Sequence, residues 1–254
     1  MEVPSERLDG RHALVTGAGR GLGRACALTL ASAGAAVSCV ARSGNELDAL
    51  VSEIEAGGDR AWSRPADITD PQAIEEVVEE ADAEQPISIL VTAAGLNRTG
   101  SASEYPLSNW DLLMDVNVRG TFLCCREVGR RMLDRGEGGR IVTISSQMGS
   151  VGYPGRVAYC ASKHAVNGLT KALAVEWAPQ RITVNAVAPT FVRTPMTRPM
   201  LTDPEFAAEV RRRIPGGEIA TLGDVAAAVL YLASDRAAAV TGHVLAVDAG
   251  WTAW

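Results

Sequence analysis

The sequence has few of the residues that build disulfide frameworks and metal centres. Its five cysteines form an odd set without a Cys-x-x-Cys pair, and its three histidines lie far apart. These spacings predict neither structural disulfides nor a zinc site, and no metal is expected. Cys160 is interpreted as a small packing residue, with a reactive thiol as the alternative.

Long apolar runs and concentrated positive charge are also absent. No window reaches the ~18 uninterrupted apolar residues that a membrane helix needs, and the first eleven residues contain acids but no apolar run. We therefore expect a cytoplasmic protein with no membrane partner. The formal net charge is −6 and the basic residues are scattered, so no nucleic-acid partner is expected and small-molecule chemistry is favoured.

Hydrophobic residues make up 47% of the 254-residue chain, enough for one large core. Apolar, β-branched segments alternate with longer stretches of helical periodicity, a pattern typical of βαβ units around a buried parallel sheet. The expected strands are HALVTG, AAVSCVA, ISILVTAAG, GRIVTISS, RITVNAVAP and HVLAVDAG, and the expected helices cover residues 21–33, 45–56, 71–83, 109–133, 157–177 and 223–234. We predict an α/β, Rossmann-type doubly wound sheet with helices on both faces, in a single domain over residues 1–254.

The stretch from Pro189 to Leu222 breaks this alternation. It holds five prolines and a cluster of arginines and is too long for an ordinary connection. We predict that residues from about 190 to 222 form a substrate lid.

The segment TGAGRGLG runs from a predicted strand directly into a predicted helix. Its glycines let the backbone approach a pyrophosphate, and the helix start supplies unpaired N–H groups. The GxxxGxG spacing differs from the GxGxxG fingerprint, so tight strand-to-helix packing and a methyltransferase-type ligand are the alternatives. Dinucleotide binding is favoured, with contacts from Gly17, Arg20, Gly21, Leu22 and Gly23.

The second predicted strand ends at Ala41 and Arg42, where binders of the unphosphorylated cofactor usually place an acid. A guanidinium binds a 2′-phosphate through charge-assisted hydrogen bonds, and Arg20 approaches from the glycine loop. NADP(H) is therefore predicted as the preferred cofactor, with NAD(H) as the alternative. If both arginines are only solvated charges, this preference disappears.

Tyr159 and Lys163 stand four residues apart in a helical segment, so their side chains project from one face. An ammonium ~4 Å from a phenol, at an effective dielectric of ~20, lowers the phenol pKa from ~10 to ~7. Tyr159 is therefore predicted to be the general acid in reduction and the general base in oxidation.

Ser146 ends the strand GRIVTISS, where open α/β sheets place ligand-contacting groups. Alternation along the strand predicts that only one of Ser145 and Ser146 faces the site. Asn117 is an unusual helix-interior residue and would be favoured if its amide bound a water leading to Lys163. Each residue alone fits a structural role, but Asn117, Ser146, Tyr159 and Lys163 together favour catalysis.

The chain resembles the short-chain dehydrogenases/reductases from about residue 7 to its C-terminus. TGAGRGLG matches the cofactor loop of that family, and YCASK, with Ser146 thirteen residues before Tyr159, matches its catalytic pattern. The resemblance implies a seven-stranded parallel sheet, a homotetramer and hydride transfer between a nicotinamide ring and a carbon bearing oxygen. It also implies that Lys163 contacts the nicotinamide ribose, that Ser146 orients the substrate oxygen and that Asn117 anchors a proton-relay water. Further cofactor contacts are implied at Asp67, Ile68, Ala94, Gly95, Tyr159, Lys163, Pro189, Val192 and Thr194.

One segment departs from the family pattern. Thr92-Ala93-Ala94-Gly95 stands where NNAG is usual, so the asparagine that ties the central strands together is missing. Thr92 keeps one hydroxyl, and we expect altered sheet tethering rather than lost activity.

The predicted function is an NADP(H)-dependent dehydrogenase/reductase of a small polar secondary alcohol, such as a sugar, polyol or aldonate, similar to the gluconate and sugar dehydrogenase branch. Reduction of apolar ketones or 3-oxoacyl thioesters is the alternative, because the lid also carries apolar side chains. A non-catalytic NADP(H)-binding protein and an epimerase or dehydratase are less favoured. The expected site wall comprises Asn97, Arg98, Gln147, Met148, Tyr153 and the lid from Thr190 to Arg213, with polar Arg193 and Arg198 and apolar Phe191, Met196, Met200 and Leu201.

The last predicted strand and the tail, GHVLAVDAGWTAW, contain two tryptophans. This is more apolar surface than a free terminus normally exposes. A partner subunit is expected to cover it.

Overall fold

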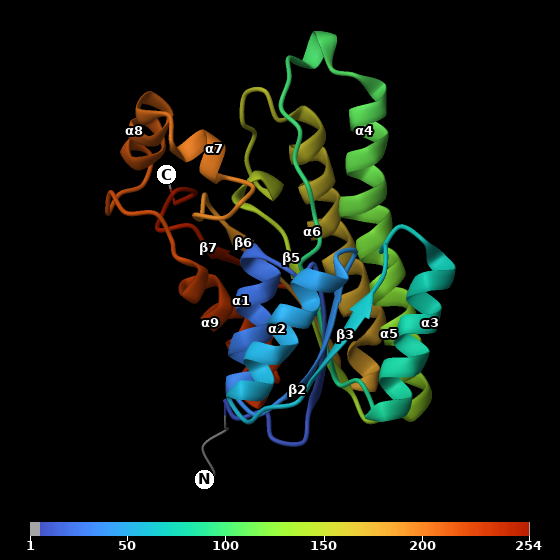
Figure 1. Cartoon of the computed structure of the whole chain (residues 1–254). Coiled ribbons are helices and arrows are strands. Elements are labelled where there is room, and N and C mark those ends of the chain that lie inside the picture. Colours follow the sequence, from blue (N-terminus) through green and yellow to red (C-terminus); the bar gives the residue numbers. More distant parts are fainter. Residues whose placement is uncertain (1–5, 254) are drawn as a thin grey trace.

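The computed structural model describes residues 6–253 and contains one sheet of seven parallel strands. Their order is β3-β2-β1-β4-β5-β6-β7, so the chain winds outward first in one direction and then in the other (Figure 1). This confirms the doubly wound fold predicted from the alternating pattern. The strands are β1 (His12–Thr16), β2 (Ala36–Ala41), β3 (Ala61–Pro65), β4 (Ile89–Thr92), β5 (Gly139–Ile144), β6 (Ile182–Pro189) and β7 (Val244–Val247).

The pattern of apolar segments did not reveal β3. Its sequence, AWSRP, has no apolar run, and only two of its five residues are buried. Arg64 nevertheless is 8% exposed, because its guanidinium pairs with Glu80 at 2.9 Å and with Glu84 at 2.7 Å. β3 is an edge strand held by ion pairs, a class that hydrophobic periodicity does not detect.

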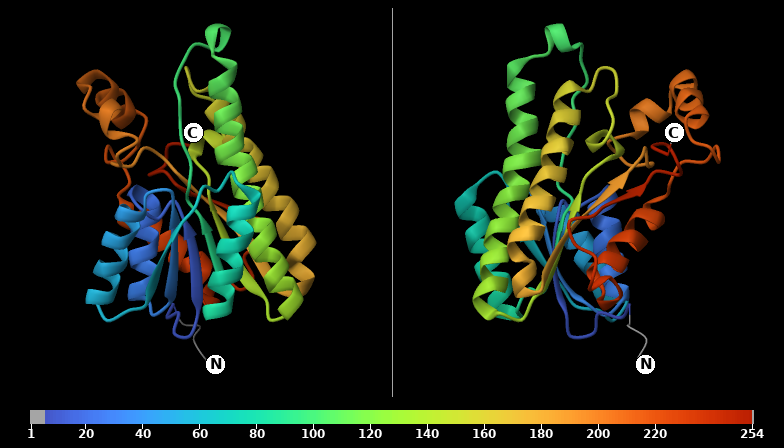
Figure 2. Two further views of the ribbon diagram at one scale, coloured as in Figure 1. Left: turned by 45° about the vertical axis from the view of Figure 1, so that its right-hand side comes forward. Right: turned by 180° about the vertical axis from the view of Figure 1, so that it is seen from behind.

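Helices cover both faces of the sheet (Figure 2). One buried cluster joins one helix layer to the sheet and a second joins the other layer, as a doubly wound fold requires. The first layer contains α1 (Gly21–Ser32), α2 (Gly44–Ala56) and α9 (Leu222–Ala233), and the second contains α3 (Pro71–Glu84), α5 (Thr121–Arg135) and α6 (Val157–Trp177).

The predicted helix over residues 109–133 is interrupted. It consists of α4 (Leu107–Met114), a π-helical segment (Asp115–Gly120) and α5. π-Helical turns widen a helix locally and often occur at functional sites. This one contains Asn117, whose side chain is completely buried.

The predicted lid is more regular than expected. It contains α7 (Arg198–Leu201) and α8 (Pro204–Arg212), which lie above the ends of β6 and β7 (Figure 1). Asp203 caps α8 by accepting from Glu205 N at 2.9 Å, and Pro204 occupies its first turn. Four short 3₁₀ turns complete the described elements: Ala102–Glu104, Gln147–Gly149, Ala178–Gln180 and Asp235–Ala237.

Candidate active site

The predicted catalytic side chains meet at the carboxyl end of β5. Ser146 follows that strand, and Tyr159 and Lys163 are one turn apart on α6. The Ser146 hydroxyl lies close enough to the Tyr159 hydroxyl to lower the pKa of that phenol, and Lys163 Nζ lies 5.7 Å from the centre of the Tyr159 ring. Ser146 Oγ also accepts from Met148 N at 3.2 Å, so its position is fixed by the turn that follows the strand.

The Ser145 hydroxyl is engaged by α6 rather than turned toward Tyr159 or a substrate. It donates to Asn167 Oδ1 at 2.6 Å and to the Lys163 carbonyl oxygen at 3.5 Å. Of the two serines, only Ser146 therefore interacts with Tyr159.

Lys163 is 5% exposed and donates from Nζ to the carbonyl oxygen of Ile144 at 2.7 Å. Burial lowers its pKa to about 8, because an ammonium loses hydration inside the protein. The amine still carries its proton for most of the time at neutral pH.

Tyr159 corrects one expectation. Burial raises its pKa, and the hydrogen bond with Ser146 opposes that rise without reversing it. The sequence argument assumed that the lysine charge would dominate, whereas the ammonium is directed at the Ile144 carbonyl. In this state the phenol therefore holds its proton, which suits it to act as an acid.

The amide of Asn117 is engaged with protein groups. Nδ2 donates to Leu96 O at 2.9 Å and to Ser162 Oγ at 3.0 Å, and Oδ1 accepts from Leu96 N at 2.9 Å. Asn117 therefore ties the segment after β4 to α6. Its main-chain carbonyl accepts from the Thr121 hydroxyl at 2.8 Å and keeps one lone pair for a water.

The glycine loop lies at the point where β1 and β4 separate the two halves of the sheet. Gly17 has a φ of +67°, and a Cβ there would lie 2.7 Å from Ala94 Cα, so only glycine fits. Gly21 has a φ of +58° and lies beside Thr194. No side chain caps the start of α1, so its first N–H groups are available to an anion such as a pyrophosphate.

The segments that follow β4 and β6 also approach this loop. A Cβ on Gly95 would lie 3.3 Å from Asn117 Oδ1 and 3.8 Å from Lys163 Nζ. Val192 is buried, and its carbonyl accepts from the Thr197 hydroxyl in a turn that also holds Thr194. The structure thus brings the glycine loop, the start of the predicted lid and Lys163 together at the carboxyl edge of the sheet, near its topological switch point.

The carboxyl end of β2 carries charges of both signs. Arg42 Nη1 lies 4.0 Å from Asp67 Oδ2, and the Arg42 side chain is 76% exposed. Hydrogen bonds from the Thr69 backbone and hydroxyl lower the pKa of Asp67. Sequence reasoning missed Glu46, whose carboxylate lies so near the glycine loop that a Cβ on Gly19 would be 2.7 Å from Oε2.

Two further residues near the site are packed into the fold. Ile68 is 6% exposed and packs against Gly120, where a Cβ would lie 2.6 Å from its Cδ1. Thr92 Oγ1 is buried and makes no hydrogen bond among the described residues, so it does not replace the missing asparagine tether. Thr16 Oγ1 accepts from Ala94 N at 3.4 Å instead.

The outer wall of the site is more aromatic than expected. The ring of Phe191 lies 5.9 Å from Tyr153, 5.8 Å from Trp251 and 5.4 Å from Phe206. The Arg213 guanidinium lies 5.4 Å from the Tyr153 ring and 5.5 Å from the Trp251 ring, within cation–π range. We call these four rings the aromatic cluster.

Trp251 corrects the expectation of an exposed C-terminal face. It is 7% exposed because the aromatic cluster of its own chain covers it. The other tryptophan, Trp254, lies outside the described residues. No sequence signal pointed to Trp251 as part of the site wall, since its partners are remote in the chain.

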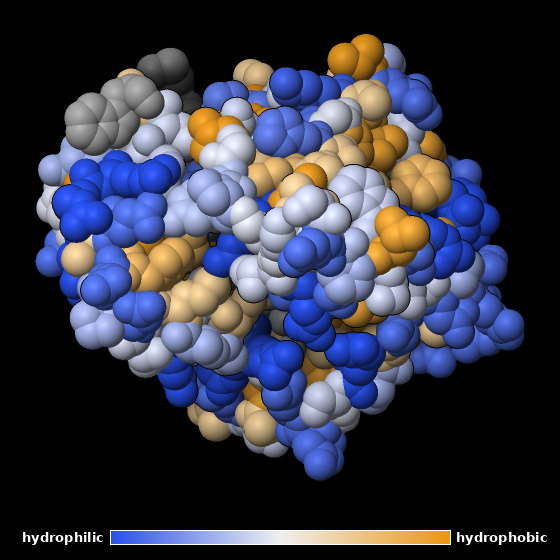
Figure 3. Space-filling model, turned by 90° about the horizontal axis from the view of Figure 1, so that it is seen from above, coloured by the Kyte–Doolittle hydropathy of each residue, from blue (hydrophilic) through white to orange (hydrophobic). Residues whose placement is uncertain are grey.

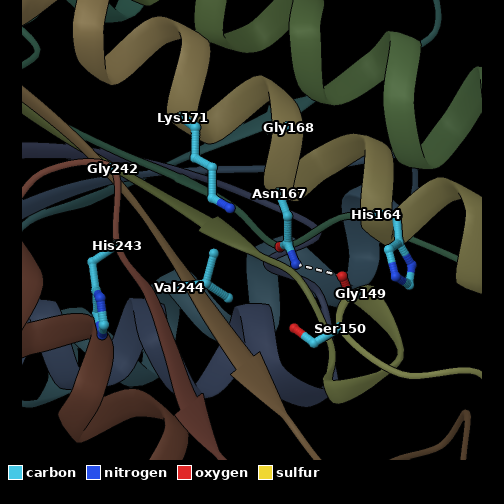
Figure 4. A pocket seen from close by; sticks show the side chains of 9 residues that line it. All are labelled: Gly149, Ser150, His164, Asn167, Gly168, Lys171, Gly242, His243 and Val244. Carbon is cyan, nitrogen blue, oxygen red and sulfur yellow. Dashed lines mark hydrogen bonds between the residues drawn. The ribbon is translucent and has the colours of Figure 1, made fainter.

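The face at the carboxyl ends of the strands is hollowed near its centre and mixes hydrophobic and hydrophilic residues (Figure 3). A second, open hollow of ≈ 590 Å³ lies between α6, the 3₁₀ turn Gln147–Gly149 and the start of β7 (Figure 4). His164, Lys171 and His243 line it, but none of the predicted cofactor or catalytic residues does. The second hollow is therefore not the predicted site.

Comparisons with known proteins agree with this geometry. A family model described as enoyl-(acyl carrier protein) reductase matches residues 17–252. D-threitol dehydrogenase of Mycolicibacterium smegmatis is 40% identical over 97% of this chain and 94% of its own length. Galactitol 2-dehydrogenase (L-tagatose-forming) of Cereibacter sphaeroides is 42% identical over 98% of this chain and 97% of its own.

The solved structures include a gluconate 5-dehydrogenase from Burkholderia cenocepacia in complex with NADP and tartrate. It superposes with a TM-score of 0.95 at 33% identity, covering 98% of each chain. Fold and site together define an oxidoreductase that uses a nicotinamide dinucleotide. The chain belongs to the short-chain dehydrogenase/reductase family. Within the described residues no helix is long and apolar enough to cross a membrane.

Proposed function

We propose that this chain interconverts a secondary alcohol and a ketone on a small polyhydroxylated substrate, a polyol or an aldonate, with NADP(H) as its preferred cofactor. The observation that carries the proposal is the grouping of buried Ser146 and Lys163 with half-buried Tyr159, near an uncapped, glycine-rich helix start. The relatives named for threitol and galactitol, and the structure holding NADP and tartrate, support the substrate class and the cofactor.

The residues around the crevice fit such a cofactor. A side chain at Gly17 or Gly23 would collide with backbone atoms, so glycine at both positions permits the tight loop whose N–H groups would face a pyrophosphate. The bound nicotinamide would supply or accept the hydride. Lys163 and Thr194 would hold its ribose and carboxamide, and Arg42 and Arg20 would bind its 2′-phosphate.

The chemistry of this chain concerns the proton. In reduction, the Tyr159 hydroxyl gives its proton to the developing alkoxide, and Ser146 donates a hydrogen bond to the same oxygen. The Lys163 cation then stabilises the phenolate. Asn117, through its main-chain carbonyl, would hold a water that returns a proton toward Lys163.

Several coarser features complete the proposal. One sheet and two helix layers support a single domain over residues 1–254, with residues 190–222 as the lid. Five free cysteines fit a reducing compartment such as the cytoplasm. The family and the half-exposed apolar strand β7 support a homotetramer.

The proposal is tested by purifying the chain and following cofactor absorbance with threitol, galactitol, gluconate, simple cyclic ketones and an acetoacetyl thioester. We expect the highest kcat/KM with a polyol or aldonate and NADP(H). The aromatic cluster makes apolar ketones the main rival. A hundredfold preference for the ketones or the thioester, about 2.7 kcal/mol, would overturn the polar-substrate assignment.

A further inference from the structure

The side chain of Gln147 is buried and has no hydrogen-bond partner. Gln147 is 2% exposed, and both Oε1 and Nε2 are among the buried polar atoms that make no hydrogen bond within residues 6–253. Buried amides are nearly always paired, because desolvation without a partner is costly. An unpaired amide next to the catalytic serine therefore needs an explanation.

The backbone around Gln147 is rigidly placed. The Gln147 carbonyl accepts from Ser150 N at 2.9 Å and from Val151 N at 3.1 Å. Two residues on, Gly149 is pressed so tightly against α6 that a Cβ would lie 2.8 Å from the Lys163 carbonyl oxygen. These contacts restrain the backbone of the turn, so a ligand is the partner that would satisfy the amide without a rearrangement of the turn.

Similar orphan atoms follow the two neighbouring strands. Asn97 Oδ1 comes after β4, and Thr190 Oγ1 comes directly after β6; both are buried without a partner. β4, β5 and β6 are adjacent in the sheet, so the three orphan groups belong to the same carboxyl edge as Ser146. A ligand that satisfies them must offer several groups that both donate and accept.

We propose that Gln147 is a specificity residue that binds the hydroxyl on the carbon next to the reacting one, so that the substrates are vicinal polyols. This inference rests on the proposed function. A hydroxyl donates and accepts at once, as the amide does. Because Gln147 directly follows Ser146, which contacts the reacting oxygen, the neighbouring substrate oxygen is the one within its reach.

The experiment compares Gln147→Met with wild type on two four-carbon secondary alcohols, threitol and 2-butanol, which differ in the hydroxyls that flank the reacting carbon. We expect kcat/KM for threitol to fall at least thirtyfold and that for 2-butanol to stay within threefold. Without substrate, the melting temperature should rise by about 2–4 °C, because methionine removes the unpaired amide. Gln147→Asn keeps an amide and should retain part of the preference for threitol over 2-butanol. This variant replaces Gln147→Met in the test if the methionine variant misfolds.

Gln180→Met is the matched control, since Gln180 is exposed in a remote turn, and it should change neither quantity. An equal fall on both alcohols, or an unchanged threitol-to-2-butanol ratio in an active enzyme, overturns the role of Gln147. A wild-type enzyme that oxidises 2-butanol but not threitol overturns the proposed function itself. The two failures are therefore distinguishable.

Discussion

Tyr159 stands in surroundings that favour its neutral form. Burial raises its pKa, while Lys163, with a pKa lowered to about 8, keeps a positive charge nearby at neutral pH. The phenol is therefore a ready proton donor for reduction, and removal of its proton for oxidation depends on the lysine charge.

We expect Tyr159→Phe to lower kcat by 10²–10⁴-fold or more, because the ring still packs but cannot exchange a proton. Cofactor affinity, measured by fluorescence titration, should stay within a few-fold of wild type. Substantial residual turnover in this variant would contradict the assignment of Tyr159 as the acid.

We expect the preference between NADP(H) and NAD(H) to depend on Arg42, at the end of β2, and on Glu46, beside Gly19. Arg42→Asp should lower the NADP-to-NAD ratio of kcat/KM at least tenfold, about 1.4 kcal/mol, because a carboxylate repels the 2′-phosphate. Glu46→Gln should raise the same ratio, since it removes a negative charge beside Gly19. A wild-type enzyme that prefers NAD(H) would show that Arg42 does not bind the phosphate.

Among the elements, β1, β2 and β3 share a buried polar network at some distance from the catalytic corner. His12 Nδ1 donates to Gln85 O at 2.6 Å, and its Nε2 accepts from the Ser38 hydroxyl at 3.0 Å. Ser38 Oγ in turn accepts from Arg64 Nε at 3.2 Å. The described direction of the Nε2 bond is that of the neutral imidazole, which is favoured because burial and the nearby Arg64 charge both lower the His12 pKa.

The stability of the fold should therefore fall in mild acid. In the unfolded chain, His12 binds a proton below about pH 6.5. In the native state its pKa is lower, so His12 stays neutral until the pH falls further. Urea unfolding at pH 7.5 and 5.5 should show that wild type loses more unfolding free energy than His12→Gln between the two pH values. Asp82, Glu80 and Glu84 also face the network, but all three are present in both wild type and His12→Gln. An equal loss of unfolding free energy in wild type and variant would exclude His12 as the cause.

The elements differ in how well the sequence predicts them. α3 begins where predicted because Asp70 caps it and Pro71 starts it. The sequence pattern did not predict β3, because this strand is held by the ion pairs of Arg64 rather than by an apolar run. The sequence pattern also did not predict the break between α4 and α5, because the helical spacing of apolar residues continues across the π-helical segment.

For the site, too, the sequence predicts local motifs well and contacts between remote segments poorly. The glycine loop, Ser146, Tyr159 and Lys163 are local motifs, and the sequence placed them together. The Tyr159 pKa, the engaged amide of Asn117 and the burial of Trp251 depend on contacts between remote segments. Such contacts are set by tertiary packing, which no local pattern encodes.

At the scale of the whole molecule, apolar side chains remain on one helical layer. Leu107 on α4, Phe122 on α5 and Val175 on α6 are 78%, 40% and 80% exposed, and α4 contacts α6. We expect light scattering at micromolar concentration to give four times the 26.7 kDa chain mass. Val175→Asp should lower that mass, and Val175→Thr should not; a wild-type monomer would contradict the tetramer.

The strand order also bears on how the protein is made. β1 is central and leaves the ribosome first, yet Ala13 on β1 must wait for Ile89 on β4, 76 positions later. At ~5–20 residues per second, its apolar edge stays uncovered for roughly 4–15 s during translation. Until β4 is made, the edge of β1 that later pairs with it therefore has no partner strand in the nascent chain.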